Sequence, residues 1–408
     1  MAARSVDYLL IGGGLASATC AASLREEGAD GSILVVGREP DPPYNRPDLS
    51  KGYMMGKESR DEVFVHPSDF WDGQNVELMT RTSVTGLDAN ERVATLQSGD
   101  EVRFGQALLA TGSNVRRLRA TGGELDGIHY LRTFGNADAI RADAEQAENV
   151  VLIGGSFIAT EVAASLTSLG KKCAIVMLEE VTLEAPFGKE VGGFFHRVLE
   201  EHGVVIHGGD ELDRFEGDGR VSKVVTKGGL ELDADLVVIG AGVTPDVTLA
   251  RAAGLKLSES GGVDVSSRLE ASSSDVYAGG DIADYDSVVH GRSLRIEHWD
   301  VAFNQGKTVA LNMLGRNVNH EEIPYFFSDL ADWSSMEYVG PGSGRVVVRG
   351  SMNDGEFTAF YLGDGGVVTA ALTVGRSDDL DPARRFIREK TAPDEGALAD
   401  LSTDLAAL

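Results

Sequence analysis

Residues 6–14 read Val-Asp-Tyr-Leu-Leu-Ile-Gly-Gly-Gly, a short apolar run that ends directly in three glycines. Residues 15–27 carry apolar side chains at helical spacing, and residues 33–36, Ile-Leu-Val-Val, are the next apolar run. This order predicts a strand, a glycine turn, a helix and a second strand, which together form a βαβ unit. The turn would aim the helix N-terminus at a pyrophosphate, with Gly12 for the tight turn and Gly14 for close approach of the phosphates.

The same plan recurs later in the chain. Residues 150–153, Val-Val-Leu-Ile, lead into Gly154-Gly155-Ser156, an expected helix over 157–169 and an expected strand over 173–178. One glycine fingerprint is weak evidence, but two of them in strand–turn–helix context predict two dinucleotide sites.

Composition excludes several classes of function. The chain has 408 residues with 37 Lys+Arg against 64 Asp+Glu, a net charge of −27, so we expect no nucleic-acid or membrane partner. The two cysteines, Cys20 and Cys173, rule out a disulfide framework and a CxxC pair. A strand pattern begins by Val6 and no apolar run is long enough to span a bilayer, so we expect a soluble, cytoplasmic protein without a signal peptide or a metal site.

The fold class expected is α/β, with two Rossmann-like dinucleotide-binding domains and a small α+β C-terminal domain. Three further segments, 107–113, 235–242 and 276–282, are buried strands that end in small residues, and short alternating strands begin at Tyr325. The expected boundaries are 1–112 and 240–320 for a split first domain, 113–239 for the second and 321–408 for the third.

Five stretches occur in an order that indicates a known family: Gly12-Gly-Gly-Leu-Ala16, Pro43-Tyr-Asn-Arg-Pro-Asp-Leu-Ser-Lys51, Ala110-Thr-Gly112, Ala278-Gly-Gly-Asp281 and Arg295-Ile-Glu-His-Trp299. Together they resemble the FAD-dependent ferredoxin, rubredoxin and putidaredoxin reductases and their relative, the apoptosis-inducing factor. The resemblance implies FAD at the first site and NADH at the second. The stretch that ends at Lys51 is the most specific to the family.

The resemblance also implies roles for single residues. Asp281 would bond the ribityl chain, with the helix after it aimed at the flavin pyrimidine, and Arg46 and Arg132 would hold the adenosine and phosphate end of FAD. Lys51 would sit beside the flavin ring, paired with Glu161. The expected cofactor contacts further include His298 and Trp299 along the flavin edge, and Leu15, Ala16, Glu39, Val84, Ala110, Thr111, Gly112, Phe157, Ile158, Glu180 and Gly242.

Several positions depart from the family pattern, among them Ser17 at the third glycine of the first fingerprint and Met177 in the place of the ribose-binding acid. Ser156 stands at the middle glycine of the second fingerprint, so that either its Cβ weakens nucleotide binding or its hydroxyl bonds the phosphate. Phe327 stands where many relatives carry Trp against the flavin or nicotinamide. Glu179 and Glu180 follow the strand, and no Arg or Lys occurs from Met177 to Gly188, so we expect NADH rather than NADPH.

Disulfide reductases of this architecture need a redox cysteine close to the flavin, and residues 43–56 contain none. We therefore expect a hydride to enter from NADH and single electrons to leave for a small iron–sulfur protein of the ferredoxin or rubredoxin type. A redox-gated interaction protein like the apoptosis-inducing factor, and an NADH oxidase or quinone reductase, are the alternatives. Docking an acidic partner would need a basic patch, with residues 116–119 and 384–390 as candidates.

Overall fold

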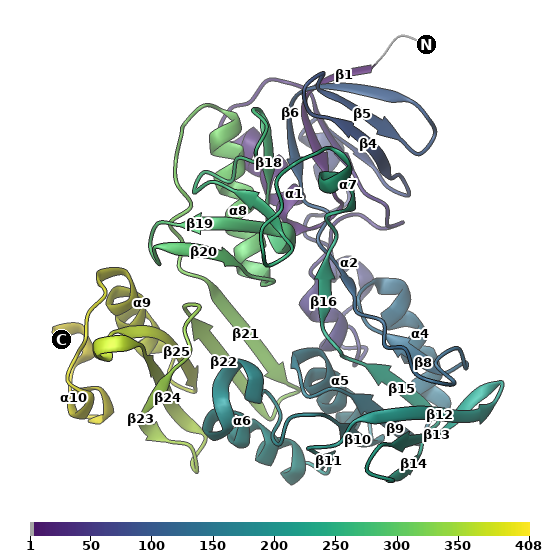
Figure 1. Cartoon of the computed structure of the whole chain (residues 1–408), viewed down its shortest axis with the longest axis vertical. Coiled ribbons are helices and arrows are strands. Elements are labelled where there is room, and N and C mark those ends of the chain that lie inside the picture. Colours follow the sequence, from purple (N-terminus) through teal and green to yellow (C-terminus); the bar gives the residue numbers. More distant parts are fainter. Residues whose placement is uncertain (1–3) are drawn as a thin grey trace. The chain divides into compact units, whose positions relative to one another are not determined.

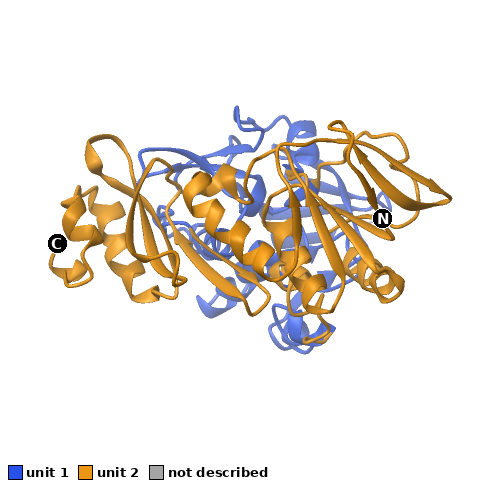
Figure 2. Ribbon diagram, turned by 90° about the horizontal axis from the view of Figure 1, so that it is seen from below, with its two compact units in different colours: residues 1–45, 60–114, 244–324 blue, residues 46–59, 115–243, 325–408 orange. Residues whose placement is uncertain are grey.

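The computed structural model describes residues 4–408. Its contacts divide the chain into two compact units, coloured separately in Figure 2. Unit 1 contains the chain up to Asn45, Arg60–Asn114 and Thr244–Pro324, and unit 2 contains Arg46–Ser59, Val115–Val243 and Tyr325–Leu408. The segment Arg46–Ser59 thus belongs by its contacts to unit 2, although both of its neighbours in sequence belong to unit 1.

Unit 1 is built on one sheet with strand order β3-β2-β1-β6-β5-β4, in which β18 also pairs with β6. Strands β1, β2, β3, β6 and β18 run parallel, while β4 and β5 join by antiparallel pairing. The strands of this sheet are β1 (Arg4–Ile11), β2 (Ile33–Val36), β3 (Val76–Met79), β4 (Val84–Asp88), β5 (Val93–Leu96), β6 (Glu101–Leu109) and β18 (Val276–Ala278).

Two helices of unit 1 pack directly against each other, α1 (Leu15–Glu26) and α8 (Trp299–Met313), as Figure 1 shows. Their backbones touch at Gly306, where a Cβ would lie 2.6 Å from the carbonyl oxygen of Ala16. The smaller elements of the unit are α2 (Arg60–Val63), α3 (Phe70–Gly73), α7 (Thr248–Ala252), β17 (Val263–Val265), β19 (Ala283–Ser287) and β20 (Arg292–Arg295).

The helix expected after Asp281 does not follow it directly, because the next α-helix begins only at Trp299. Gly280–Ile282 forms a single 3₁₀ turn, and the chain continues as β19, which pairs with β17 and β20. The strand prevails because Tyr285 is fully buried and its neighbours find backbone partners on both sides. The next helix is α8, which packs against the 3₁₀ turn.

Unit 2 contains a parallel sheet of order β11-β10-β9-β15-β8 and an antiparallel sheet of order β21-β22-β25-β24-β23. The parallel strands are β8 (Ile128–Tyr130), β9 (Asn149–Ile153), β10 (Lys172–Val176), β11 (Val205–His207) and β15 (Leu236–Ile239). The antiparallel strands are β21 (Tyr325–Leu330), β22 (Ser334–Val339), β23 (Arg345–Ser351), β24 (Glu356–Leu362) and β25 (Val368–Val374).

The helices of unit 2 include α4 (Phe134–Gln146), α5 (Phe157–Ser168) and α6 (Glu184–Glu201), and the C-terminal helices α9 (Leu380–Glu389) and α10 (Glu395–Ala399). A third sheet contains β12 (Leu212–Asp218), β13 (Arg220–Thr226) and β14 (Glu231–Asp233). Strands β7 (Ser113–Val115) and β16 (Val243–Pro245) pair where the chain passes between the units. None of the helices among residues 4–408 is long and apolar enough to cross a membrane.

Candidate functional site

The first glycine turn lies in unit 1 between β1 and α1. Gly12 has a φ of +127°, and a Cβ there would lie 2.0 Å from the carbonyl oxygen of Ala110, so only glycine fits. Gly14 caps the N-terminus of α1, and a Cβ there would meet no atom within 4 Å. The helix therefore offers its first N–H groups to open space, and this geometry fits the pyrophosphate of a dinucleotide.

Other residues expected at the first site surround this turn within unit 1. The Ala110 N–H donates to Ile11, the Thr111 hydroxyl donates to the Asp246 carbonyl over 2.6 Å, and Gly112 has a φ of +68°. Leu15 and Ala16 are buried in α1, and Val84 opens β4 half-buried.

The acid expected after the second strand, Glu39, lies half-buried and accepts a hydrogen bond from the Tyr44 hydroxyl over 2.5 Å. Its neighbour Arg38 donates to Asp246 over 2.9 Å and to Asn114 over 2.6 Å. The Arg38 guanidinium is therefore held by hydrogen bonds to other side chains of unit 1.

The 3₁₀ turn at Asp281 packs on α8 in the same unit. The Gly280 N–H donates to Oε1 of Gln305 over 2.8 Å, while the amide nitrogen Nε2 of Gln305 is buried and without a partner in residues 4–408. His298 caps α8, and the Trp299 indole donates to Asn45 over 2.8 Å. A polar group that presents both donors and acceptors, as the ribityl chain and the flavin ring do, would satisfy the orphaned amide.

Three further expected residues, Lys51, Glu161 and Phe327, come together within unit 2 with two serines. We call this group the Lys51 centre: Ser50, Lys51, Glu161, Phe327 and Ser328. The ammonium nitrogen of Lys51 lies 2.8 Å from Oε2 of Glu161, and these residues are only 9% and 3% exposed. The Lys51 ammonium also lies 5.9 Å from the centroid of the Phe327 ring.

Two serine hydroxyls complete the Lys51 centre. Ser50 donates to Oε2 of Glu161 over 2.6 Å, and Ser328 donates to Oε1 over 2.5 Å. A buried carboxylate is costly unless it is paired and hydrogen-bonded, and these three donors satisfy both of its oxygens. Sequence reasoning missed both serines as site residues, although Ser50 lies inside the family stretch and Ser328 follows Phe327.

Asp48, also missed, lies on the same turn as Lys51. Burial, and after it the nearby carboxylate of Glu58, raise the pKa of Asp48 to about 6 against the opposing charge of Lys51. Oε2 of Glu58 is itself buried without a hydrogen-bond partner in the described residues. Two acidic side chains, one before and one after Lys51 in the sequence, therefore accompany the buried ammonium.

Arg46 and Arg132, expected at the far end of FAD, contact each other in unit 2, where an Arg46 guanidinium N–H donates to the Arg132 carbonyl over 2.6 Å.

The second glycine turn precedes α5. Gly154 has a φ of +113°, and a Cβ there would lie 2.5 Å from the carbonyl oxygen of Gly240. The Ser156 hydroxyl donates to that same carbonyl group over 2.9 Å. Phe157 and Ile158 open α5 half-buried, and the Phe157 ring lies 4.5 Å from that of Phe326.

The charges beyond this turn differ from expectation. Glu180 is exposed and pairs with Lys189 over 2.6 Å, one residue past the stretch that we found free of cations. The repulsion of a 2′-phosphate is therefore weaker than the sequence suggested, because the carboxylate is partly neutralised. Gly242, with a φ of +88°, follows β15 and accepts a hydrogen bond from the Arg116 N–H.

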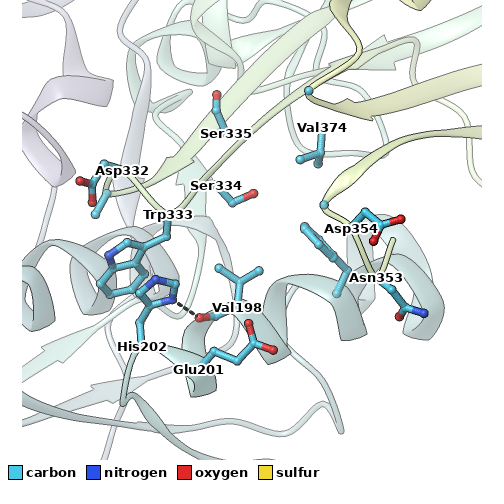
Figure 3. A pocket seen from close by; sticks show the side chains of 14 residues that line it. Val198, Glu201, His202, Asp332, Trp333, Ser334, Ser335, Asn353, Asp354 and Val374 are labelled. Carbon is cyan, nitrogen blue, oxygen red and sulfur yellow. Dashed lines mark hydrogen bonds between the residues drawn. The ribbon is translucent and has the colours of Figure 1, made fainter. Parts of the chain in front are cut away.

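Both cysteines are free and buried, and burial raises the pKa of each thiol, that of Cys173 to about 11. Within residues 4–408 no cluster of His, Cys, Asp or Glu could hold a metal ion. A surface hollow of about 520 Å³ in unit 2 contains none of the expected site residues; the Trp333 and His202 rings stack at its wall, 4.2 Å apart (Figure 3).

Comparison with known proteins agrees with these observations. Residues 6–306 match the pyridine nucleotide-disulphide oxidoreductase model, and residues 325–408 match the Reductase C-terminal model. The ferredoxin–NAD(+) reductase component of the anthranilate 1,2-dioxygenase system of Burkholderia cepacia is 32% identical over 98% of both chains. Putidaredoxin reductase of Pseudomonas putida is 30% identical over 98% of this chain and 96% of its own.

Solved structures carry the similarity into three dimensions. The crystal structure of the covalent putidaredoxin reductase–putidaredoxin complex matches with a TM-score of 0.92 at 30% identity, over 98% of this chain and 97% of that one. The expected fold class and family resemblance are confirmed, and members of the family use FAD and NAD(H). The chain belongs to the pyridine nucleotide-disulphide oxidoreductase family.

Proposed function

We propose that this protein is an FAD-dependent reductase that takes a hydride from NADH and passes single electrons to a small iron–sulfur protein of the ferredoxin type. The observation that carries the proposal is the Lys51 centre. The segment that would hold a redox cysteine in a disulfide reductase holds Lys51 instead, whose buried ammonium pairs with Glu161 of α5, and the two cysteines are buried elsewhere. Two relatives named as ferredoxin–NAD reductases match over nearly their whole length.

The protein's own groups would bind and orient the cofactors. The N-terminus of α1 behind Gly14 would hold the FAD pyrophosphate, and the turn behind Gly154 would hold that of NADH. Asp281, Arg46 and Arg132 would contact the rest of FAD. When bound, the flavin supplies the hydride-accepting and electron-releasing chemistry that the side chains lack.

Lys51 would act by its charge. A fixed ammonium close to the flavin ring favours the negatively charged reduced form of the ring. Glu161 holds that ammonium at 2.8 Å, and the low exposure of both groups limits screening by water. The pair would therefore set how readily the flavin accepts a hydride.

The arginines of the two candidate docking patches differ in the contacts that they make with other groups of the protein. Arg384 pairs with Asp381 over 2.7 Å, and Arg385 donates to the Leu405 carbonyl over 2.8 Å. Arg117 lies over the Tyr130 ring, 5.3 Å from its centroid.

We place the protein in the cytoplasm, because its two buried free thiols suit a reducing compartment.

Anaerobic stopped-flow mixing of the FAD-loaded protein with NADH, and separately with NADPH, tests the proposal. Rapid bleaching of the flavin absorbance by NADH, followed by reduction of an added ferredoxin, is the expected result. Fast turnover with oxygen or a quinone, but none that depends on an iron–sulfur protein, would favour the oxidase or quinone reductase. A purified protein that takes up no FAD would end the flavoenzyme proposal.

A further inference from the structure

The Glu161 carboxylate in the Lys51 centre is held by donors from two separate segments of the chain. Oε2 receives Ser50 and Lys51, which lie together in the segment 46–59. Oε1 receives Ser328, the one donor recorded to it within residues 4–408, from strand β21. Glu161 itself lies in α5.

Strand β21 is seated against α5 by more than this one bond. Phe326 and Ser328 lie two residues apart and so face the same side of the strand. Phe326 packs on Phe157 of α5 with ring centroids 4.5 Å apart, while Ser328 reaches Glu161. The Ser328 hydroxyl is therefore held at the carboxylate by a packed aromatic contact next to it.

The position of Lys51 depends on the orientation of this carboxylate. Apart from Glu161, the acceptor recorded for the Lys51 ammonium is the Pro47 carbonyl at 3.4 Å, which is long for a hydrogen bond. If Oε1 lost its donor, the buried carboxylate would have an unsatisfied oxygen and would turn toward other donors. Oε2 would then leave the line between Ser50 and Lys51.

We propose that Ser328 is a positioning residue for Lys51, acting through Glu161: its hydroxyl fixes the carboxylate that fixes the ammonium. The region that matches the Reductase C-terminal model would thus contribute two things to the site. One is the aromatic ring of Phe327, and the other is the hydroxyl of Ser328 that helps to position the charge beside the flavin. The inference rests on the proposed function, in which Lys51 lies beside the flavin.

The test compares the flavin reduction potential and the rate of reduction by NADH in five variants of the full-length, FAD-loaded protein. Ser328→Ala removes the hydroxyl, and Ser328→Thr keeps it. Ser334→Ala is the matched control. It removes a buried hydroxyl from the next strand, β22, and this hydroxyl has no hydrogen-bond partner in the described chain. Lys51→Met reports the full effect of losing the charge.

Ser328→Ala is expected to lower the reduction potential in the same direction as Lys51→Met but by less, and to slow reduction by less than Lys51→Met does, about threefold, since one hydrogen bond is lost while the charge remains. Ser328→Thr should recover most of both effects, and Ser334→Ala should change neither. Ser50→Ala, which removes a donor to Oε2, should shift the potential in the same direction, and it serves if Ser328→Ala does not fold.

An unchanged potential in Ser328→Ala and Ser50→Ala, together with a lowered one in Lys51→Met, would overturn the inference and leave the proposed function in place. An unchanged potential and rate in Lys51→Met would overturn both the inference and the proposed role of Lys51. A lowered potential in Ser334→Ala as large as that in Ser328→Ala would also overturn the inference, because the effect would then come from packing of the hairpin.

Discussion

Ser156 donates its hydroxyl hydrogen to the carbonyl oxygen of Gly240 over 2.9 Å. The bond joins the turn after β9 to the end of β15, two strands that are neighbours in the parallel sheet. The sequence left open whether this serine obstructs the nucleotide or bonds its phosphate. In the structure the hydroxyl of Ser156 already donates to a backbone carbonyl. We therefore expect its Cβ, rather than its hydroxyl, to affect nucleotide binding.

Replacing Ser156 by Gly is expected to tighten NADH binding, because the backbone of the turn can then approach the pyrophosphate more closely. Replacing it by Ala keeps the Cβ and should leave the Kd for NADH nearly unchanged, while loss of the bond to Gly240 lowers stability by about 1 kcal/mol. Calorimetric titration with NADH and thermal unfolding measure the two effects. Equal tightening by Ala and Gly would show that the hydroxyl, rather than the Cβ, controls affinity.

Lys51→Met should slow reduction of the flavin by NADH by about tenfold or more, because the fixed positive charge is lost, while FAD retention changes little. Stopped-flow absorbance measures the rate, and the absorbance ratio of the purified protein measures bound flavin. Lys57→Met is the matched control, since it removes an exposed lysine of the same segment. Unchanged reduction kinetics in Lys51→Met would remove Lys51 from the mechanism.

Asp48→Asn should stabilise the protein at neutral pH and not in acid. Burial raises the pKa of Asp48 from 3.8 to about 6, so the folded state binds this proton more tightly than the unfolded state. Its contribution to the free energy of unfolding therefore falls as pH rises from about 4 to about 6, and stays at the lower value above that. The Tm difference between Asp48→Asn and the parent should grow across this window.

A pH series of thermal unfolding curves checks this result, with Asp61→Asn, at an exposed position, as the control for loss of one negative charge. A Tm difference that is the same at every pH would contradict the role of the raised Asp48 pKa.

Arg349→Met should release the C-terminal segment. This buried guanidinium donates to the carbonyls of Asp400 and Thr403 and lies 3.5 Å from the buried carboxylate of Asp379. Breaking a buried charge pair costs on the order of 3 kcal/mol, and the carbonyls of the tail lose their donor as well. Limited proteolysis should cut the variant near its C-terminus before the parent.

Arg345→Met is the comparison for this prediction, because Arg345 is an exposed residue of the same strand, β23, and pairs with Glu395 of α10. Water replaces such a partner readily, so its proteolysis pattern should match the parent. Equal resistance of Arg349→Met and the parent would show that the tail is held by its apolar contacts alone.

The two glycine turns could be predicted from the sequence because each is a local arrangement. Gly12 and Gly154 are required by carbonyl oxygens that lie close to them, and the flanking apolar runs already announce the strands and helices. Lys51 and Glu161 are 110 positions apart, so no local pattern joins them, and the family resemblance supplied their pairing.

The remaining features depend on packing between distant segments. Ser328 becomes a site residue only because β21 lies against α5. The strand after Asp281, β19, forms because β17 and β20 flank it. Its short sequence, Ala283–Ser287, contains no pattern that predicts this pairing. Lys189 of the following helix partly neutralises Glu180, and it lies one residue beyond the cation-free stretch from Met177 to Gly188.

The division of the chain has a consequence for its synthesis. Each unit is assembled from three separate segments, and unit 2 takes its last segment, from Tyr325 onward, at the end of the chain. Ser328 therefore leaves the ribosome long after Ser50 and Glu161, and until then the carboxylate lacks its second hydroxyl. A nascent chain that stops before Tyr325 would leave the Glu161 carboxylate without its Ser328 donor, so the Lys51 centre can be completed only near the end of synthesis.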